Sequence, residues 1–502
     1  MEEKSLKEKT ARGLWWGFLN NGAMQLFNAI FGIVLAKLLS DSDYGLAGEV
    51  AIFSAIAAAL QESGFVSALT NRKNPTHLDY NSVFWFNITV GFVLYVILWF
   101  CAPLIVRFFD DPELLWLSRY AFVGFFLASF SITPRAILFR QMKVKEQTII
   151  SITALVVSGC VGVTMAVCKM GYWCVPTQGI VFVTLISVLS WRVSGWRPSL
   201  QVSLQPIRQM FGFSCKMLIT NVFNCINNSI FAFAFGHFYN KHTVGIYTQA
   251  DKWNKMGSQL ITGMVQGVAQ PMFVQVGDER ERLRRVFRKM TRFTAFISFP
   301  AMFGLSLVAP EFITVIIDPK WLPSAQLMQL LCIAGAFMPI TSLYFNFLIS
   351  RGRSDVYMWN TLSQGIIVLL LLISIRQWGW CIHLHTSFLS LQLSGIRLMV
   401  ISYVVVYILW LLLWHWFVRR EIGLSFFSSL LDLLPFAGVA ILTMLFTWWV
   451  TNVLQLADVG LWLLLIVRIL FAAALYLGLM WILKAEVMRE SFSYIKSKTH
   501  HQ

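Results

Sequence analysis

Two lysines one helical turn apart lie inside a long apolar stretch of this sequence. They begin a row of polar side chains at steps of three or four residues: Lys252, Lys255, Gln259, Thr262, Gln266 and Gln270. This spacing places the row on one face of a helix. An ammonium group binds phosphate as a compact point charge with mobile donors. The row therefore predicts a surface for an anion, such as a pyrophosphate that is bound and later released.

Three other apolar stretches carry similar polar residues. We take as further candidate binding residues Lys37, Lys216, Asn21, Gln25, Asn28 and Asn224. The acidic residues in these stretches and in the stretch of the lysine row are Glu49, Glu62 and Asp251. Charges inside a bilayer usually face a partner or a wet cavity, so we expect these acids to act as counter-charges or in ion coupling. For each amide taken alone, the other interpretation is a hydrogen bond between neighbouring helices.

The elements that must position these residues are fourteen apolar stretches. Each is long enough to cross a bilayer, which requires roughly 20 residues of helix. They lie near residues 14–39, 44–68, 80–106, 113–133, 149–168, 171–191, 211–236, 243–276, 290–309, 323–349, 355–375, 396–417, 430–450 and 460–483. The sequence therefore predicts an all-α polytopic membrane protein with about 14 transmembrane helices.

The distribution of basic residues predicts the orientation of these helices. With the spans drawn as above, 28 of the 40 Lys and Arg residues fall on one side and 5 on the other. Loops rich in Lys and Arg stay in the cytoplasm. We therefore expect an inner-membrane protein that has both termini in the cytoplasm.

Composition excludes several classes of function. The chain is 57% hydrophobic and only 13% charged, which leaves no room for a large extramembrane domain. Its net charge of +16 is explained by topology and contact with anionic lipid, so nucleic acid is not an expected partner. The eight cysteines lack metal-type spacing, and His383 with His385 offers only two ligands. We assign no metal and no cofactor.

A repeat within the chain predicts its domain organisation. The sequence 26–30 resembles 222–226, and Asp43-Tyr44-Gly45 has a counterpart in Val244-Gly245-Ile246-Tyr247. Six spans separate the copies, so we expect two six-helix lobes related by a pseudo-twofold axis along the membrane normal. The predicted domains are 1–208 (spans 1–6), 209–417 (spans 7–12) and 418–502 (spans 13–14 and a cytoplasmic tail). Transporters with this organisation bind substrate between the lobes and alternate its access.

A cytoplasmic stretch, 279–292, is basic and amphipathic. Its apolar residues Leu283, Val286, Phe287 and Met290 share one face, and we expect this face to lie flat on the inner leaflet. Its expected role is that of a topogenic, lipid-contacting linker.

Several short motifs, in order, resemble one known family. They are 38–45 (LLSDSDYG), 62–69 (ESGFVSAL), 134–138 (PRAIL) with Arg140, 244–247 (VGIY) with 250–252 (ADK), Pro271, and 320–323 (KWLP). Together they resemble the polysaccharide transporter branch of the multidrug/oligosaccharidyl-lipid/polysaccharide flippase superfamily, which contains Wzx-type and colanic-acid-type flippases. The resemblance covers about residues 10–350, and 376–397 departs from the pattern.

The resemblance implies a function that agrees with the cationic row. It implies translocation of an undecaprenyl-pyrophosphate-linked oligosaccharide from the inner to the outer leaflet for surface polysaccharide biosynthesis, and it matches Lys252 to a basic position in the family's eighth span. The expected partners are the lipid-linked oligosaccharide, membrane lipid, and polysaccharide polymerase and chain-length proteins. We therefore expect a transporter and not an enzyme.

Two alternatives remain open. One is a multidrug or ion antiporter of the same superfamily, although cationic drugs require an acidic cavity. The other, which the sequence favours less, is a membrane polysaccharide polymerase. A polymerase requires a sizeable outer loop with catalytic Arg or His residues, and the longest predicted outer connection, near 376–396, is short.

Overall fold

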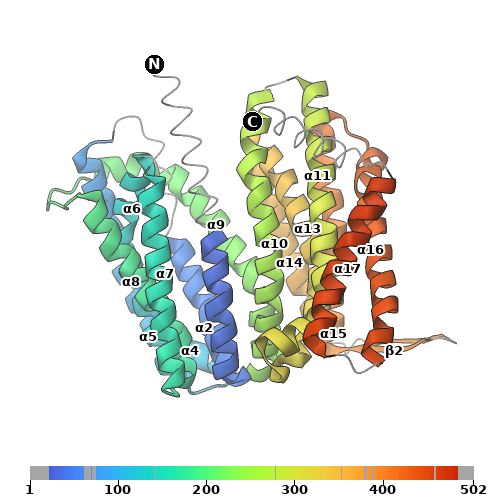
Figure 1. Ribbon diagram of the computed structural model, residues 1–502. Helices are drawn as coiled ribbons and strands as arrows, with labels where there is room; N and C mark the ends of the chain where they lie inside the picture. Colours follow the sequence, from blue (N-terminus) through green and yellow to red (C-terminus); the bar gives the residue numbers. More distant parts are fainter. Residues whose placement is uncertain are drawn as a thin grey trace, which may run out of the picture. The chain divides into compact units, whose positions relative to one another are not determined.

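The computed structural model describes residues 22–61, 69, 75–141, 143–276, 279–351, 353–377, 381–386, 389–456 and 460–483. The chain divides into two compact units, Met1–Thr248 and Gln249–Gln502. Each unit is described by itself below, with the labels of Figure 1.

Unit 1 is built of helices. After the helix Gly22–Leu38 they are α2 (Asp41–Gln61), α4 (His77–Phe109), α5 (Leu114–Ala128), η1 (Ser129–Ser131), α6 (Ile132–Arg140), α7 (Val144–Val167), η2 (Gly171–Trp173), α8 (Cys174–Ser194), α9 (Leu204–Phe238) and the start of α10 (Lys241–Val276). Helices α7 and α8 pack side by side, as do α4 and α5, and α2 packs on α9.

Unit 2 contains the rest of α10 and the elements that follow it. These are α11 (Arg280–Leu307), α12 (Ala309–Glu311), the π-helical turn η3 (Phe312–Ile317), η4 (Pro319–Trp321), α13 (Leu322–Ser350), α14 (Ser354–Gln377), β1 (Cys381–Thr386), β2 (Leu389–Ser394), α15 (Gly395–Ile422), α16 (Phe426–Leu456) and α17 (Leu461–Ile482). Helix α11 packs on both α13 and α16, and α17 packs on α16.

Each of the fourteen predicted stretches coincides with helix in the described residues. Nine of the described helices are long and apolar enough to cross a membrane, or ten if α11 and the following helical segment, bent by 59° from it, form one span. The predicted all-α, multi-pass membrane fold is confirmed. The count of fourteen spans and the division into lobes at residues 208 and 417 remain predictions.

Helices α2 and α10 begin in the same way, 200 residues apart. The Ser40 hydroxyl accepts a hydrogen bond from the Asp43 N–H at 3.1 Å, and the Asn240 side-chain oxygen accepts one from the Thr243 N–H at 2.9 Å. Each bond satisfies an N–H that the first helical turn leaves without a partner. The repeat suggested by the sequence is therefore visible in the local structure of these two helix starts.

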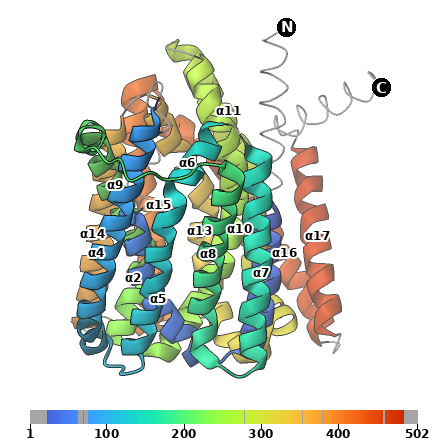
Figure 2. The same cartoon turned by 90° about the vertical axis from the view of Figure 1, so that its left-hand side faces the viewer.

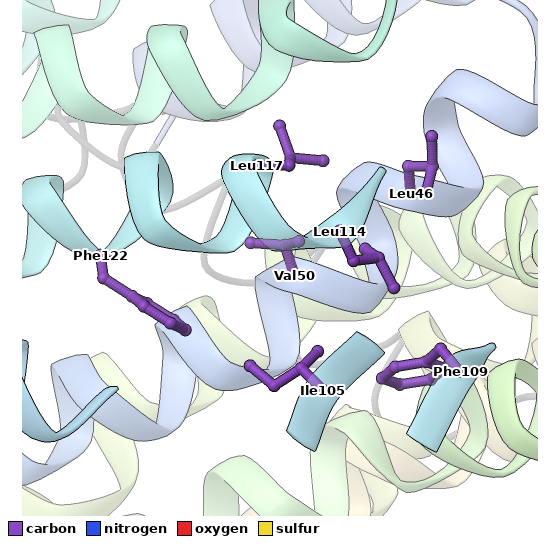
Figure 3. Close-up of a cluster of buried hydrophobic side chains, with 7 residues drawn as sticks. All are labelled: Leu46, Val50, Ile105, Phe109, Leu114, Leu117 and Phe122. Atoms are coloured by element: carbon purple, nitrogen blue, oxygen red, sulfur yellow. The ribbon is translucent and has the colours of Figure 1, made fainter. Parts of the chain in front are cut away.

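A hydrophobic cluster packs the first turns of α2 against the end of α4 and the start of α5. Figure 3 shows its seven buried side chains converging from α2, α4 and α5: Leu46, Val50, Ile105, Phe109, Leu114, Leu117 and Phe122. Phe109 is the last residue of α4, and Asp110 after it has a left-handed conformation with φ of 55°. The chain turns there sharply enough for α5 to return against α4.

The predicted span 113–133 is a broken helix, α5–η1–α6. Pro134 has no N–H and its ring would clash with the carbonyl of Phe130, four residues earlier. The 3-10 turn η1 lies at this point. The freed carbonyl of Phe130 accepts a hydrogen bond from Trp191 Nε1 at 2.6 Å, so the break is stabilised by α8.

The prediction that the apolar face of 279–292 lies on the inner leaflet is wrong. The segment is the first part of α11, and Leu283 and Phe287 are buried in the protein. The Phe287 ring contacts the rings of Tyr344 and Phe347 on α13 at centroid distances of 4.9 and 5.3 Å. A helix with one apolar stripe buries it against whichever apolar surface is nearest, and here that surface is protein.

The region that departs from the family pattern contains a hairpin. Strands β1 and β2 pair antiparallel, from Cys381 opposite Ser394 to Thr386 opposite Leu389. The sequence predicts only a short outer connection near 376–396 and gives no sign of a two-stranded element.

Candidate anion-binding site

The predicted lysine pair lies deep along α10, in unit 2. At about 1.5 Å per residue, Lys252 and Lys255 are roughly 17 and 21 Å from the first residue of the helix. Both side chains are half-buried. Lys255 forms an ion pair with Asp251, one turn earlier, at 2.7 Å, and Lys252 Nζ lies 5.7 Å from the centroid of the Trp253 ring.

The residues between the lysines fix the orientation of α10. Trp253 and Asn254 are buried, and the Trp253 ring contacts that of Phe312. Asn254 fits only because position 335 is glycine, where a Cβ would lie 2.3 Å from the Asn254 Oδ1. With this face buried, Asp251, Lys252 and Lys255 remain half-buried on another face and Gln259 is exposed.

Asn254 is a polar residue that the sequence analysis missed. Neither amide atom has a hydrogen-bond partner among the described residues, and an unsatisfied buried amide is costly. Its position between two lysines was the available signal.

In unit 1, helices α2 and α10 cross at two glycines. A Cβ on Gly45 would lie 2.0 Å from the carbonyl oxygen of Lys241, and one on Gly245 would lie 2.1 Å from that of Asp41. The two contacts are reciprocal, as expected for equivalent positions of a repeat. Small residues let helix backbones approach this closely in membrane proteins.

Charged residues surround this crossing. Lys241 Nζ lies 3.0 Å from a carboxylate oxygen of Asp111 and 3.3 Å from one of Glu113, and His242 pairs with Asp41. Burial by itself lowers the pKa of Lys241, but its hydrogen bonds with Asp111 and Glu113 and their negative charges outweigh that effect and raise the pKa. Lys241 therefore remains a cation throughout the physiological pH range.

Glu49 is a buried carboxyl group below the crossing. Its side chain on α2 is 2% exposed, and its Oε2 has no hydrogen-bond partner among the described residues. The absence of a side chain at Gly236 of α9 leaves room for Glu49 and Phe109. A Cβ at position 236 would lie 2.3 Å from the ring of Phe109 and 3.4 Å from Cγ of Glu49. A buried carboxyl group in such a place needs a proton or a cation.

The remaining predicted site residues are placed as follows. Gln25 and Asn224 are half-buried, whereas Asn28 and Lys37 are exposed. Asn21, Glu62 and the side chain of Lys216 lie outside the described residues. The structure thus brings together Lys255 and Asp251, and the joint site formed by all the candidates remains a prediction.

Two buried ion-pair groups in unit 2 were not anticipated. Arg468 of α17 donates to Glu311 at 2.5 Å and to the Thr451 hydroxyl at 3.0 Å. Asp432 of α16 accepts from Arg288 Nε at 2.7 Å and from Arg292 Nε at 2.6 Å. A lone arginine in the apolar stretch 460–483 was a visible signal for the first group.

An apolar cavity of about 490 Å³ lies beside the first of these groups, between α11, α16 and α17. Its walls include Pro300, Leu305, Met444, Ala472 and Leu477, with Arg468 contributing a charged group. Such a cavity fits a hydrocarbon chain better than a polar ligand.

Comparison with known proteins places this geometry in context. The chain is 22% identical to the "Lipopolysaccharide biosynthesis protein WzxC" of Escherichia coli (strain K12), over 78% of this chain and 80% of the relative. It is 24% identical to the "Teichuronic acid biosynthesis protein TuaB" of Bacillus subtilis (strain 168), over 73% and 76%. It is 22% identical to the "Succinoglycan biosynthesis transport protein ExoT" of Rhizobium meliloti (strain 1021), over 71% and 72%.

Solved structures share the fold. The lipid II flippase MurJ in an inward closed conformation superposes with a TM-score of 0.70 at 14% identity, covering 93% of this chain and 98% of that one. A multidrug resistance MATE family transporter in an inward-facing conformation gives 0.62 at 15% identity, covering 80% and 94%. Residues 34–326 match the family described as "Polysaccharide biosynthesis protein", and the chain therefore belongs to that family of multi-pass membrane proteins.

Proposed function

We propose that this protein moves a lipid-linked oligosaccharide, carried on undecaprenyl pyrophosphate, from the cytoplasmic to the periplasmic leaflet for surface polysaccharide biosynthesis. The observation that carries the proposal is the lysine pair of α10. Residues 251–259 contain two lysines and one aspartate, at a depth of roughly 17 to 21 Å along the helix. A net positive charge at this depth is energetically unfavourable in a bilayer, and a bound anionic substrate offsets part of that free energy.

The chemistry of the substrate matches these groups. Lysines bind a pyrophosphate without the rigid bidentate geometry of arginine, so the anion can also leave. Half-buried Asp251 competes with the substrate for Lys255 and supplies a counter-charge when the site is empty. Amides such as Gln259 are suited to sugar hydroxyls because they both donate and accept hydrogen bonds.

The lipid part of the substrate requires an apolar path. We infer that the cavity between α11, α16 and α17 accommodates a segment of the hydrocarbon chain while the headgroup crosses. Its apolar walls support this role. Access to the headgroup site alternates between the two sides through movement of one lobe against the other.

The family and the charge pattern support the proposed setting. The protein lies in the cell inner membrane with both termini in the cytoplasm. It delivers its lipid-linked product to a polymerase and chain-length proteins on the outer side, because assembly of the unit and its polymerisation occupy opposite leaflets.

The test replaces both lysines with glutamine, which keeps length and hydrogen bonding but removes charge. We expect Lys252→Gln with Lys255→Gln to stop export, so that surface polysaccharide falls and lipid-linked units accumulate in the inner leaflet. Protein level is measured in the same cells. Lys145→Gln is the matched control, since Lys145 is an exposed residue at the start of α7. Normal export by a well-expressed double variant would contradict a role in substrate binding and would indicate that both lysines serve only in structural ion pairs.

A second candidate function, an antiporter for cationic drugs or ions, is favoured by one observation. Glu49 is a buried carboxyl group with one oxygen that has no hydrogen-bond partner in the described part of the chain, and such a group is suited to carry a proton or a cation. In that case Glu49→Gln would abolish efflux of a cationic dye, and the double lysine variant would leave dye efflux intact. Export of polysaccharide without any dye efflux by the unmodified protein would eliminate this alternative.

A further inference from the structure

The connection between α8 and α9 is an ordered, extended strap tied to the side of α4. The Ser199 N–H donates to Asn81 Oδ1 at 3.0 Å and the Ser199 carbonyl accepts from Trp85 Nε1 at 2.8 Å. Further along, the Ser203 N–H donates to the hydroxyl of Ser82 at 3.0 Å. Figure 2 shows the strap crossing between α9 and α8. Asn81 and Ser82 are fully buried, so the strap is fixed to α4 by hydrogen bonds to buried side chains.

The exposure of the side chains shows what the strap displays. Ser199 and Ser203, whose backbone groups bond to α4, are half-buried, whereas the aliphatic residues between and after them are exposed. Leu200 is 88% exposed, Val202 51% and Leu204 76%. Three aliphatic side chains are thus exposed on and directly after a segment whose backbone is tied to α4.

The contacts of the strap place it near one end of α4, a helix long and apolar enough to cross a membrane. Its contacts on α4 extend from His77, whose ring nitrogen lies 3.2 Å from the Arg197 carbonyl, to Trp85. Eight residues of helix correspond to about 12 Å along the axis. The strap therefore runs beside the first turns of α4, next to the start of its apolar part, and not beyond the end of the helix.

The charges of the strap and of the adjoining ends of α8 and α9 indicate which surface contacts its aliphatic side chains. Residues 192–208 contain three arginines, Arg192, Arg197 and Arg208, and no Asp or Glu. All three are exposed. Aliphatic groups flanked by basic groups match a surface with an apolar interior and negative headgroups. We propose that the strap 195–204 is an interfacial anchor that binds the anionic phospholipids of the inner leaflet, with Leu200, Val202 and Leu204 inserted and the three arginines at the headgroups.

A photocrosslinking residue placed in the full-length protein tests this contact in living cells. The p-benzoylphenylalanine side chain is introduced at position 200, 202 or 204, with position 201 as the matched control because Gln201 is also exposed. We expect phospholipid adducts at 200 and 204 at several times the level found at 201. A protein adduct at 200, or equal phospholipid adducts at 200 and 201, would overturn the proposal.

The role of the arginines is tested separately with purified protein in nanodiscs that contain both phosphatidylglycerol and phosphatidylcholine. The triple variant Arg192→Gln, Arg197→Gln, Arg208→Gln should lose its preference for phosphatidylglycerol in native mass spectrometry, by about five-fold for each arginine that contacts the headgroups. Arg107→Gln, at the opposite end of α4, should retain the preference. An unchanged preference in the triple variant would also overturn the proposal. Neither readout measures export, so both results are independent of the proposed transport function.

Discussion

The buried pair of Arg468 and Glu311 permits a quantitative prediction of stability. The side chains are 3% and 6% exposed, and their atoms are 2.5 Å apart. Glu311→Ala leaves a guanidinium buried among apolar groups of α11 and α16 with no carboxylate. Removal of one partner of a buried pair costs about 3–5 kcal/mol. We expect this single variant to lose a large part of the total stability.

The double variant Glu311→Leu, Arg468→Met should recover most of that loss. Replacing both charges with apolar groups of similar volume is often neutral or stabilising. The Thr451 hydroxyl loses Arg468 as a donor but still donates to the Thr447 carbonyl at 2.7 Å, so the double change does not leave this hydroxyl without a partner. We expect the double variant to lie within about 1 kcal/mol of the unmodified protein.

The assay is reversible unfolding in mixed micelles with increasing sodium dodecyl sulfate, followed by tryptophan fluorescence. A double-mutant cycle built from Glu311→Leu, Arg468→Met and their combination gives a coupling energy, which we expect to be about 3 kcal/mol. Additive effects of the two single changes, with a coupling below about 0.5 kcal/mol, would refute the view that the two charges stabilise each other.

The remaining predictions concern the other structural features. Gly45→Ala should destabilise the protein by about 1–3 kcal/mol, because the new Cβ meets a carbonyl oxygen at 2.0 Å; Gly263→Ala on α10, with no atom within 4 Å, is the control, and equal melting curves for the two would contradict the crossing. Asp432→Asn should cost about 1–3 kcal/mol, because two guanidinium groups lose a charged acceptor; the unfolding assay above measures this, and a loss below 0.3 kcal/mol would show that the group behaves as a surface ion pair. Reporter fusions after Arg208 and Arg285 should read cytoplasmic and those near Lys241 and Lys320 periplasmic, and a periplasmic signal at Arg285 would end the fourteen-span topology.

Local sequence properties were sufficient for much of the fold. Apolar stretches of bilayer length predicted helices throughout the chain, because a span needs only its own hydrophobicity and internal hydrogen bonds. The repeat signal around Gly45 and Gly245 correctly singled out two equivalent helix starts. The lysine pair on one face of α10 also followed from spacing alone, since helical geometry fixes which residues share a face.

Long-range contacts could not be read from the sequence in the same way. The apolar face of 283–290 is equally compatible with lipid and with protein, and only the position of α13 placed Phe287 against Tyr344 and Phe347. Nothing in the local pattern distinguishes the extended strap at 199–203 from an ordinary loop, because its order comes from Asn81 and Trp85, more than 110 residues earlier.

The sequence by itself thus determined that this chain is a multi-pass helical membrane protein with a cationic row in one span, since hydrophobicity, charge and helical period are properties of neighbouring residues. The tertiary structure decided which charges are paired. Arg468 meets Glu311 across 157 residues, whereas Lys255 meets Asp251 one turn away. The energy of a buried charge depends on the atoms that surround it, and those atoms are assembled only when distant helices pack.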